Sequence, residues 1–162
     1  MKTKKPLHIE LSPEMKKALD DKDTSIFVSN EYLFQRKVDE MVIGEQFKIG
    51  FVDLLKDSEN IAAMQGVRWD QATESLVSTT AEKASAETNV VTLPVDEISE
   101  ATVVAYFTGN IRFFVSNDDG ETFEHVIPGS IKKFNKKDNR LKVYFVFLDE
   151  GAVLDHYAVL AN

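Results

Sequence analysis

The chain has 162 residues, of which 43% are hydrophobic and 28% charged, a globular composition in a chain long enough to bury a core without a metal or disulfide. Its formal net charge of −8, from 27 acidic and 19 basic residues, argues against nucleic acid as a main partner, because phosphate backbones are bound by clustered cations. The absence of cysteine excludes disulfides, thiolate catalysis and cysteine-ligated metals.

The N-terminal part of the chain predicts a basic arm followed by short elements. Met1–Pro6 is basic, but no apolar segment follows it, so we expect a protein made in the cytoplasm without a cleavable signal or a membrane span. Ser12, Pro13 and Glu14 are typical of the first residues of a helix, and apolar residues follow them at helical spacing. This pattern predicts a short helix within Ser12–Asp23. Asn30–Ile43 fits either a second helix or a strand, and the pattern leaves that choice open. The alternation over Phe47–Phe51 is typical of a strand.

From Gly66 onward the pattern predicts β-structure, with turn residues between strands roughly ten residues apart. The polar stretch Thr79–Thr88 has no periodicity and is predicted to be a loop. The predicted strands are Val67–Asp70, Glu74–Ser78, Val90–Val95, Ala101–Phe107, Ile111–Ser116, Thr122–Ile127, Leu141–Leu148 and His156–Leu160.

This pattern predicts a mainly β protein, an antiparallel β-sandwich or jelly roll with a short N-terminal helical extension. We expect residues 1–60 to form an N-terminal arm and helical connector that serves for attachment, and residues 61–162 to form the sandwich domain. Leu141–Leu148 is apolar on both faces at its far end and therefore needs cover on both sides. Either the N-terminal segment or a subunit interface would supply that cover.

The most specific local feature is the segment Ser116–Phe123, which fits the pattern Ser-x-Asp-x-Gly-x-Thr-aromatic and resembles the Asp-box. The carboxylate of Asp118 suits acceptance of hydrogen bonds from turn amides, and Gly120 tolerates positive φ. Thr122 begins the return strand, and Phe123 is expected to pack the turn onto the core. These residues, with Ser116, predict a structural turn; a single copy does not predict a propeller.

A calcium site is the functional alternative for this turn, since Asp118, Asp119 and Glu121 carry oxygen ligands. The spacing is not that of a dedicated calcium loop, and turn chemistry explains the same residues without a metal. We therefore predict no cofactor and no metal.

Catalysis finds little support in the sequence. His8, His125 and His156 are scattered without metal-ligand spacing, and neither a nucleophile elbow nor a phosphate-binding glycine loop is present. Trp69 follows Val67 with period two, which predicts an inward core position rather than a sugar-stacking platform. We therefore predict that the chain is not an enzyme.

Two groups of basic residues have a structural and a functional interpretation. A cluster around Phe134 is predicted to be a solvated hairpin loop, or else a patch for phosphate or an acidic partner surface. Its members are Lys132, Lys133, Lys136, Lys137 and Arg140. Near the N-terminus, Lys2, Lys4 and Lys5 form a flexible basic tail, or a docking arm for an acidic partner.

Taken in order, four segments resemble the β-sandwich modules of tailed-phage virion proteins, which have a galactose-binding-like or jelly-roll fold. They are Gly66–Asp70, Leu76–Val77, Ile111–Phe123 and Arg140–Phe145. The resemblance covers residues 61–162.

The resemblance implies a non-enzymatic structural component of a virion, in the tail, neck, baseplate or head-fibre apparatus. Its partners would be other virion proteins and, in a homo-oligomer, its own copies, with no nucleic acid and no membrane. The alternative is a carbohydrate-binding module that recognises a host-surface glycan. The family offers no catalytic or sugar-binding residue that maps onto a position of this chain.

Overall fold

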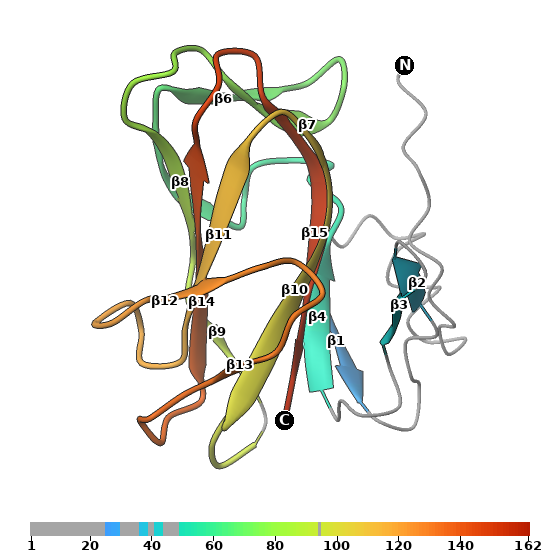
Figure 1. Cartoon of the computed structure of the whole chain (residues 1–162), viewed down its shortest axis with the longest axis vertical. Coiled ribbons are helices and arrows are strands. Elements are labelled where there is room, and N and C mark those ends of the chain that lie inside the picture. The colour runs from blue at the N-terminus through green and yellow to red at the C-terminus, as the bar shows by residue number, and fades with distance from the viewer. Residues whose placement is uncertain (1–24, 30–35, 39–40, 44–48, 94) are drawn as a thin grey trace.

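The computed structural model describes residues 25–29, 36–38, 41–43, 49–93 and 95–162, and throughout these residues its regular elements are strands. Two antiparallel sheets face each other across a shared hydrophobic core, so the predicted β-sandwich is confirmed (Figure 1). The part of the chain described contains no helix with the length and apolar character needed to cross a membrane.

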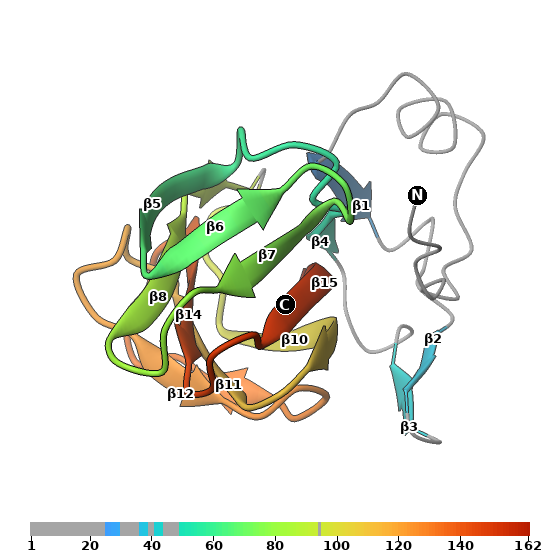
Figure 2. The same cartoon turned by 90° about the horizontal axis from the view of Figure 1, so that it is seen from above.

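The first layer is a seven-stranded sheet with the C-terminal strand near its centre. Its main path follows, in spatial order, β1 (Ser25–Ser29), β4 (Ile49–Asp53), β15 (Val153–Ala161), β10 (Glu100–Thr108) and β13 (Lys132–Lys133). The hairpin of β6 (Val67–Asp70) and β7 (Ser75–Ser78) joins this sheet through pairing of β7 with β15. Figure 2 shows this hairpin lying across one end of the sandwich.

The second layer is a six-stranded sheet centred on one long apolar strand. Its order is β12 (Glu124–Val126), β11 (Ile111–Ser116), β14 (Arg140–Phe147), β8 (Ala84–Thr88) and β5 (Ile61–Gln65), and β9 (Val91–Thr92) pairs with the start of β14. A separate two-stranded hairpin consists of β2 (Arg36–Val38) and β3 (Met41–Ile43).

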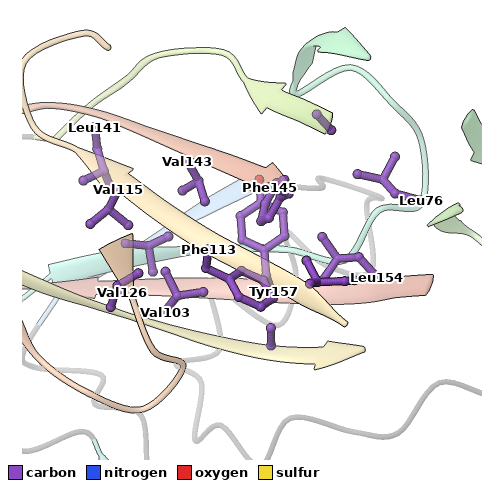
Figure 3. Packing of buried hydrophobic residues seen from close by; sticks show 14 of the residues in the cluster. Leu76, Val103, Phe113, Val115, Val126, Leu141, Val143, Phe145, Leu154 and Tyr157 are labelled. Atoms are coloured by element: carbon purple, nitrogen blue, oxygen red, sulfur yellow. The ribbon is translucent and has the colours of Figure 1, made fainter. Parts of the chain in front are cut away.

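Period-two alternation explains how the two layers bury their facing sides. Along β14, Leu141, Val143, Phe145 and Phe147 are at most 1% exposed and point into the core. The ring of Phe145 contacts those of Phe113 on β11, at 5.7 Å between centroids, and Tyr157 on β15, at 5.0 Å. Both contacts are edge-on, and the one between Phe145 and Tyr157 joins the two sheets within the core (Figure 3).

The strands with buried side chains on both faces are β10 and β15, rather than β14. Thr102 and Val104 on β10 and Ala158 and Leu160 on β15 face away from the shared core, yet each is at most 2% exposed. The corresponding face of β14 is half-buried, and the Tyr144 ring there packs against aromatic neighbours of the same sheet.

One predicted element differs in the structure, and one open choice between helix and strand is decided where the structure describes it. Thr79–Thr88 is not all loop, because β8 forms over its last five residues between β14 and β5. For Asn30–Ile43, the strand alternative holds where the structure describes the segment, because β2 and β3 pair there as a hairpin and no helix forms. The helix predicted within Ser12–Asp23 lies outside the described residues.

The sandwich also includes residues that precede residue 61 in the chain. Strand β4 pairs with β15, where Phe51 lies opposite Val159, and the side chains of Phe51 and Leu55 are fully buried in the core. Trp69 packs against this core as expected, and its indole nitrogen donates a hydrogen bond to the Leu55 carbonyl at 2.8 Å. The division into domains at residues 60 and 61 stays a prediction, but β1 and β4 belong to the sheet itself.

Candidate functional site

The turn that joins β11 to β12 is built around the carboxylate of Asp118, which is 2% exposed. Its Oδ1 accepts hydrogen bonds from the Ser116 hydroxyl at 2.6 Å and the Thr122 amide at 3.0 Å, and its Oδ2 accepts one from the Thr122 hydroxyl at 2.7 Å. The Ser116 hydroxyl oxygen accepts the amides of Asp118 and Gly120. The chain reverses through positive φ values of 60° at Asp119 and 81° at Gly120. Glycine adopts such a conformation without strain, which suits position 120.

A lysine from a distant loop completes this turn. The Lys136 ammonium lies 2.8 Å from Asp118 Oδ2 and 3.2 Å from Glu121 Oε2. Burial opposes ionisation of Asp118, but hydrogen bonds from Lys136, Ser116 and Thr122 outweigh it and hold the pKa of this carboxyl well below its usual range. Lys136 thus supplies the positive charge that the calcium alternative assigns to a metal ion.

The turn is also tied to its surroundings through the next side chain. Asn117 is buried, and its amide nitrogen donates hydrogen bonds to the carbonyls of Ile98 at 3.1 Å and Lys136 at 2.8 Å. The Arg140 amide donates to the Asn117 carbonyl at 3.1 Å. Three separate segments therefore meet at this turn.

Most of the basic cluster around Phe134 is paired with acidic residues, chiefly of this hairpin. Besides the Lys136 contacts, Lys132 lies 3.3 Å from Glu124, and Arg140 lies 2.6 Å from Asp138. The hydrogen bonds from Arg140 lower the pKa of Asp138 to about 2. The cluster members without an ion pair to any described residue are Lys133 and Lys137. The cluster is therefore not a free basic patch.

Phe123 does not pack the turn onto the core, contrary to the prediction. Its ring lies beside that of Tyr144, at 5.6 Å between centroids, on the face of the six-stranded sheet that points away from the core. The physical reason is the alternation itself: Phe123 stands two residues before exposed His125 and three before buried Val126, so period two places it on the outer side.

Phe123 extends a line of rings that we call the aromatic row, consisting of Phe123, Tyr144, Phe114 and His125. Phe114 lies directly opposite Tyr144 of β14 on one side and His125 of β12 on the other. The ring centroids are 6.0 Å apart for Phe114 and Tyr144, and 5.2 Å apart for Phe114 and His125. His125 is exposed and the other three are half-buried, so the row forms part of the outer surface.

The sequence does not reveal the row, because Phe123 comes from the turn and the other members come from three strands whose register is set by tertiary pairing. The available signal was period two: Phe114 and Tyr144 alternate with inward-facing Phe113 and Phe145. Such alternation shows that an aromatic residue faces outward, but not which other residues lie beside it.

A second group of buried polar side chains lies where β4 meets β15. Asp53 is 1% exposed; its carboxylate accepts hydrogen bonds from the Leu55 amide at 2.8 Å, Asn60 at 3.2 Å and the Tyr157 hydroxyl at 3.2 Å. Burial is the main cause that raises the pKa of Asp53 to about 6, and burial also raises the pKa of Tyr157. All of these contacts lie within the fold, so the group serves to join the two strands.

The raised pKa of Asp53 predicts a pH-dependent stability. Between pH 4 and 6 the folded state retains a proton that the unfolded state has released, so stability falls as the pH rises across this window. A shift from 3.8 to about 6 corresponds to roughly 3 kcal/mol in the free energy of unfolding. For Asp53→Asn this dependence should vanish, so its stability relative to wild type should rise by about that amount between pH 4 and pH 7.5. Urea unfolding of both proteins across this range measures the difference, and a constant difference would contradict the prediction.

The remaining predicted site residues do not come together. His125 belongs to the aromatic row, whereas His156 is buried on β15 beside the Tyr106 ring at 4.9 Å. His8, Lys2, Lys4 and Lys5 lie outside the described residues. Within the described residues, no group of three or more histidine, aspartate or glutamate side chains is arranged to hold a metal ion.

Comparison with known proteins gives no family assignment. No family model matches the sequence, and no curated protein matches it. Among solved structures, the chain is similar to an exo-β-1,3-galactanase from Phanerochaete chrysosporium determined with galactose, at 16% sequence identity and a TM-score of 0.35. That similarity covers 68% of this chain but 29% of the galactanase chain. It is too weak to carry an argument about fold or activity.

Proposed function

We propose that this protein is a non-enzymatic structural component of a tailed-phage particle, in its tail, neck, baseplate or head-fibre apparatus. It acts through assembly contacts with other virion proteins and with its own copies, on a sandwich of the jelly-roll type. The observation that carries the proposal is the segment at the centre of the family resemblance, Ser116–Phe123. Its polar groups are bonded within the protein itself, as expected for a rigid assembly module.

Two other carboxylates with perturbed pKa values, Asp53 and Asp138, support the same proposal. Asp53 is held by Leu55, Asn60 and Tyr157, and Asp138 by Arg140, so each is bonded within the fold. A catalytic acid or base needs to reach a reacting group on a bound substrate. Perturbed pKa values also arise in structural networks, and these contacts are of that kind.

Immunogold electron microscopy of particles induced from the source strain tests this proposal. With antibody raised against the full chain, we expect gold at one discrete location on the particle, which would also identify the apparatus. Labelling with pre-immune serum is the control. Particles without label, from a lysate in which the same antibody detects the protein, would refute a virion role.

A further inference from the structure

The outer face of the six-stranded sheet combines the aromatic row with a cation, Arg112, that forms no ion pair with the residues described. Arg112 lies two residues before Phe114 on β11, is exposed, and stands opposite the apolar side chain of Val146 on β14. The other arginines whose side chains the structure describes each face an aspartate: Arg68 lies 3.5 Å from Asp70, and Arg140 lies 2.6 Å from Asp138. Arg112 has no ion pair with any described residue.

Arg112 gives this face a positive charge in a chain with a formal net charge of −8. A guanidinium group presents a planar set of donors that fits a carboxylate in a bidentate geometry. In charge, this part of the face therefore complements an anionic group.

The rest of the face suits the body of a sugar. Half-buried rings on adjacent strands offer flat apolar surfaces that complement the C–H face of a pyranose. At the other side of Tyr144, Lys142 and Glu87 form a half-buried pair at 3.2 Å, with Glu87 directly opposite Tyr144. Such polar groups beside aromatic rings provide donors and acceptors for hydroxyl groups.

We propose that this face binds an acidic polysaccharide, with pyranose rings on Phe114 and Tyr144 and a uronate carboxylate on Arg112. The row crosses β12, β11 and β14, with centroid separations of 5.2 and 6.0 Å, so it forms an open platform suited to an extended polymer. The ion pair of Lys142 and Glu87 leaves Arg112 as the charged group that selects an anion. This inference goes beyond the assembly role and does not depend on it.

Affinity gel electrophoresis of the purified full chain tests the proposal at physiological salt, where long-range repulsion from the acidic chain is screened. The gels contain polygalacturonate, alginate or hyaluronate, and methyl-esterified polygalacturonate serves as the neutral comparator. We expect at least one acidic polymer to retard the protein, and the neutral comparator to retard it much less. Arg112→Gln should weaken binding at least about tenfold, as expected for loss of a charge-assisted hydrogen bond.

The matched control is Lys133→Gln, which removes the same charge from an exposed position on the other sheet. It should bind like wild type. Phe114→Ala should weaken binding, whereas Phe114→Tyr, which keeps a ring, should retain it. The urea midpoint of each variant shows whether it is folded, and only folded variants are compared.

Four results would overturn the proposal. The first is no retardation by any acidic polymer, and the second is equal retardation by the neutral comparator. The third is an equal loss of binding in Arg112→Gln and Lys133→Gln. The fourth is normal polymer binding by Arg112→Gln and Phe114→Ala together with their loss from particles, which would make the face a protein interface. Particles without label in the microscopy experiment would refute the virion role and leave this inference standing.

Discussion

Replacing Asp118 by alanine is expected to lower the free energy of unfolding by about 3–5 kcal/mol, because the change leaves a lysine and several turn donors without their acceptor. The carboxylate is 2% exposed and binds Ser116, Thr122 and Lys136. Urea unfolding at pH 7 measures the loss. The charge of Asp118 stabilises the fold above its unfolded-state pKa of about 4, so the difference between wild type and variant should shrink as the pH falls below that value.

The neighbouring aspartate provides the control for this prediction. Asp119 is 42% exposed at its side chain, lies 3.6 Å from Arg140 and has positive φ, which asparagine tolerates. Asp119→Asn should therefore change stability by less than about 0.5 kcal/mol, as is usual for exposed positions. A similar loss in both variants would show that charge near the turn matters rather than the buried hydrogen bonds of Asp118.

The Asp118 network and the aromatic row differ in how far the sequence predicts them. The turn is local: within Ser116–Thr122, the residue types and their spacing determine most of its hydrogen bonds. The contribution of Lys136 is not local, because it depends on where the loop before β14 returns to the hairpin. The aromatic row depends entirely on the register of β12, β11 and β14, which period-two patterns do not specify.

The strands show the same division between local and long-range information. Leu141–Leu148 was predicted from its alternation, and β14 forms there with its apolar face inward. Strand β8 was missed because Ala84, Ser85 and Ala86 have little intrinsic preference for strands. Its conformation is fixed by pairing with β14 on one side and β5 on the other. Tertiary contacts supply what local propensity does not.

Strand β4 was predicted from its alternation but assigned to a separate connector. The sequence pattern places a boundary at residue 60, whereas Asp53 pairs with Tyr157, which lies 104 residues later in the chain. No short-range pattern encodes a contact over that separation. The buried Asp53 group therefore escaped prediction together with the strand pairing that creates it.

The two faces of β14 predict opposite consequences for adjacent aromatic residues. Phe145 is fully buried and contacts the ring of Phe113 in its own sheet and that of Tyr157 in the facing sheet. Phe145→Ala should lower the free energy of unfolding by about 3–5 kcal/mol, because a large cavity remains at the centre of the core. Urea unfolding at pH 7 provides the measurement, with the fold at low denaturant checked by circular dichroism.

Tyr144→Ala is the matched control, since it removes an aromatic side chain one position earlier on the same strand. Tyr144 is half-buried on the outer face, so its loss should cost no more than about 1–1.5 kcal/mol from its aromatic and cross-strand contacts. Equal losses in the two variants would contradict the assignment of an inner and an outer face. A large loss in Phe145→Ala and a small loss in Tyr144→Ala would show that the Tyr144 ring contributes little to stability. That ring would then be available for recognition, because a partly exposed ring that the fold does not require is free to contact a ligand.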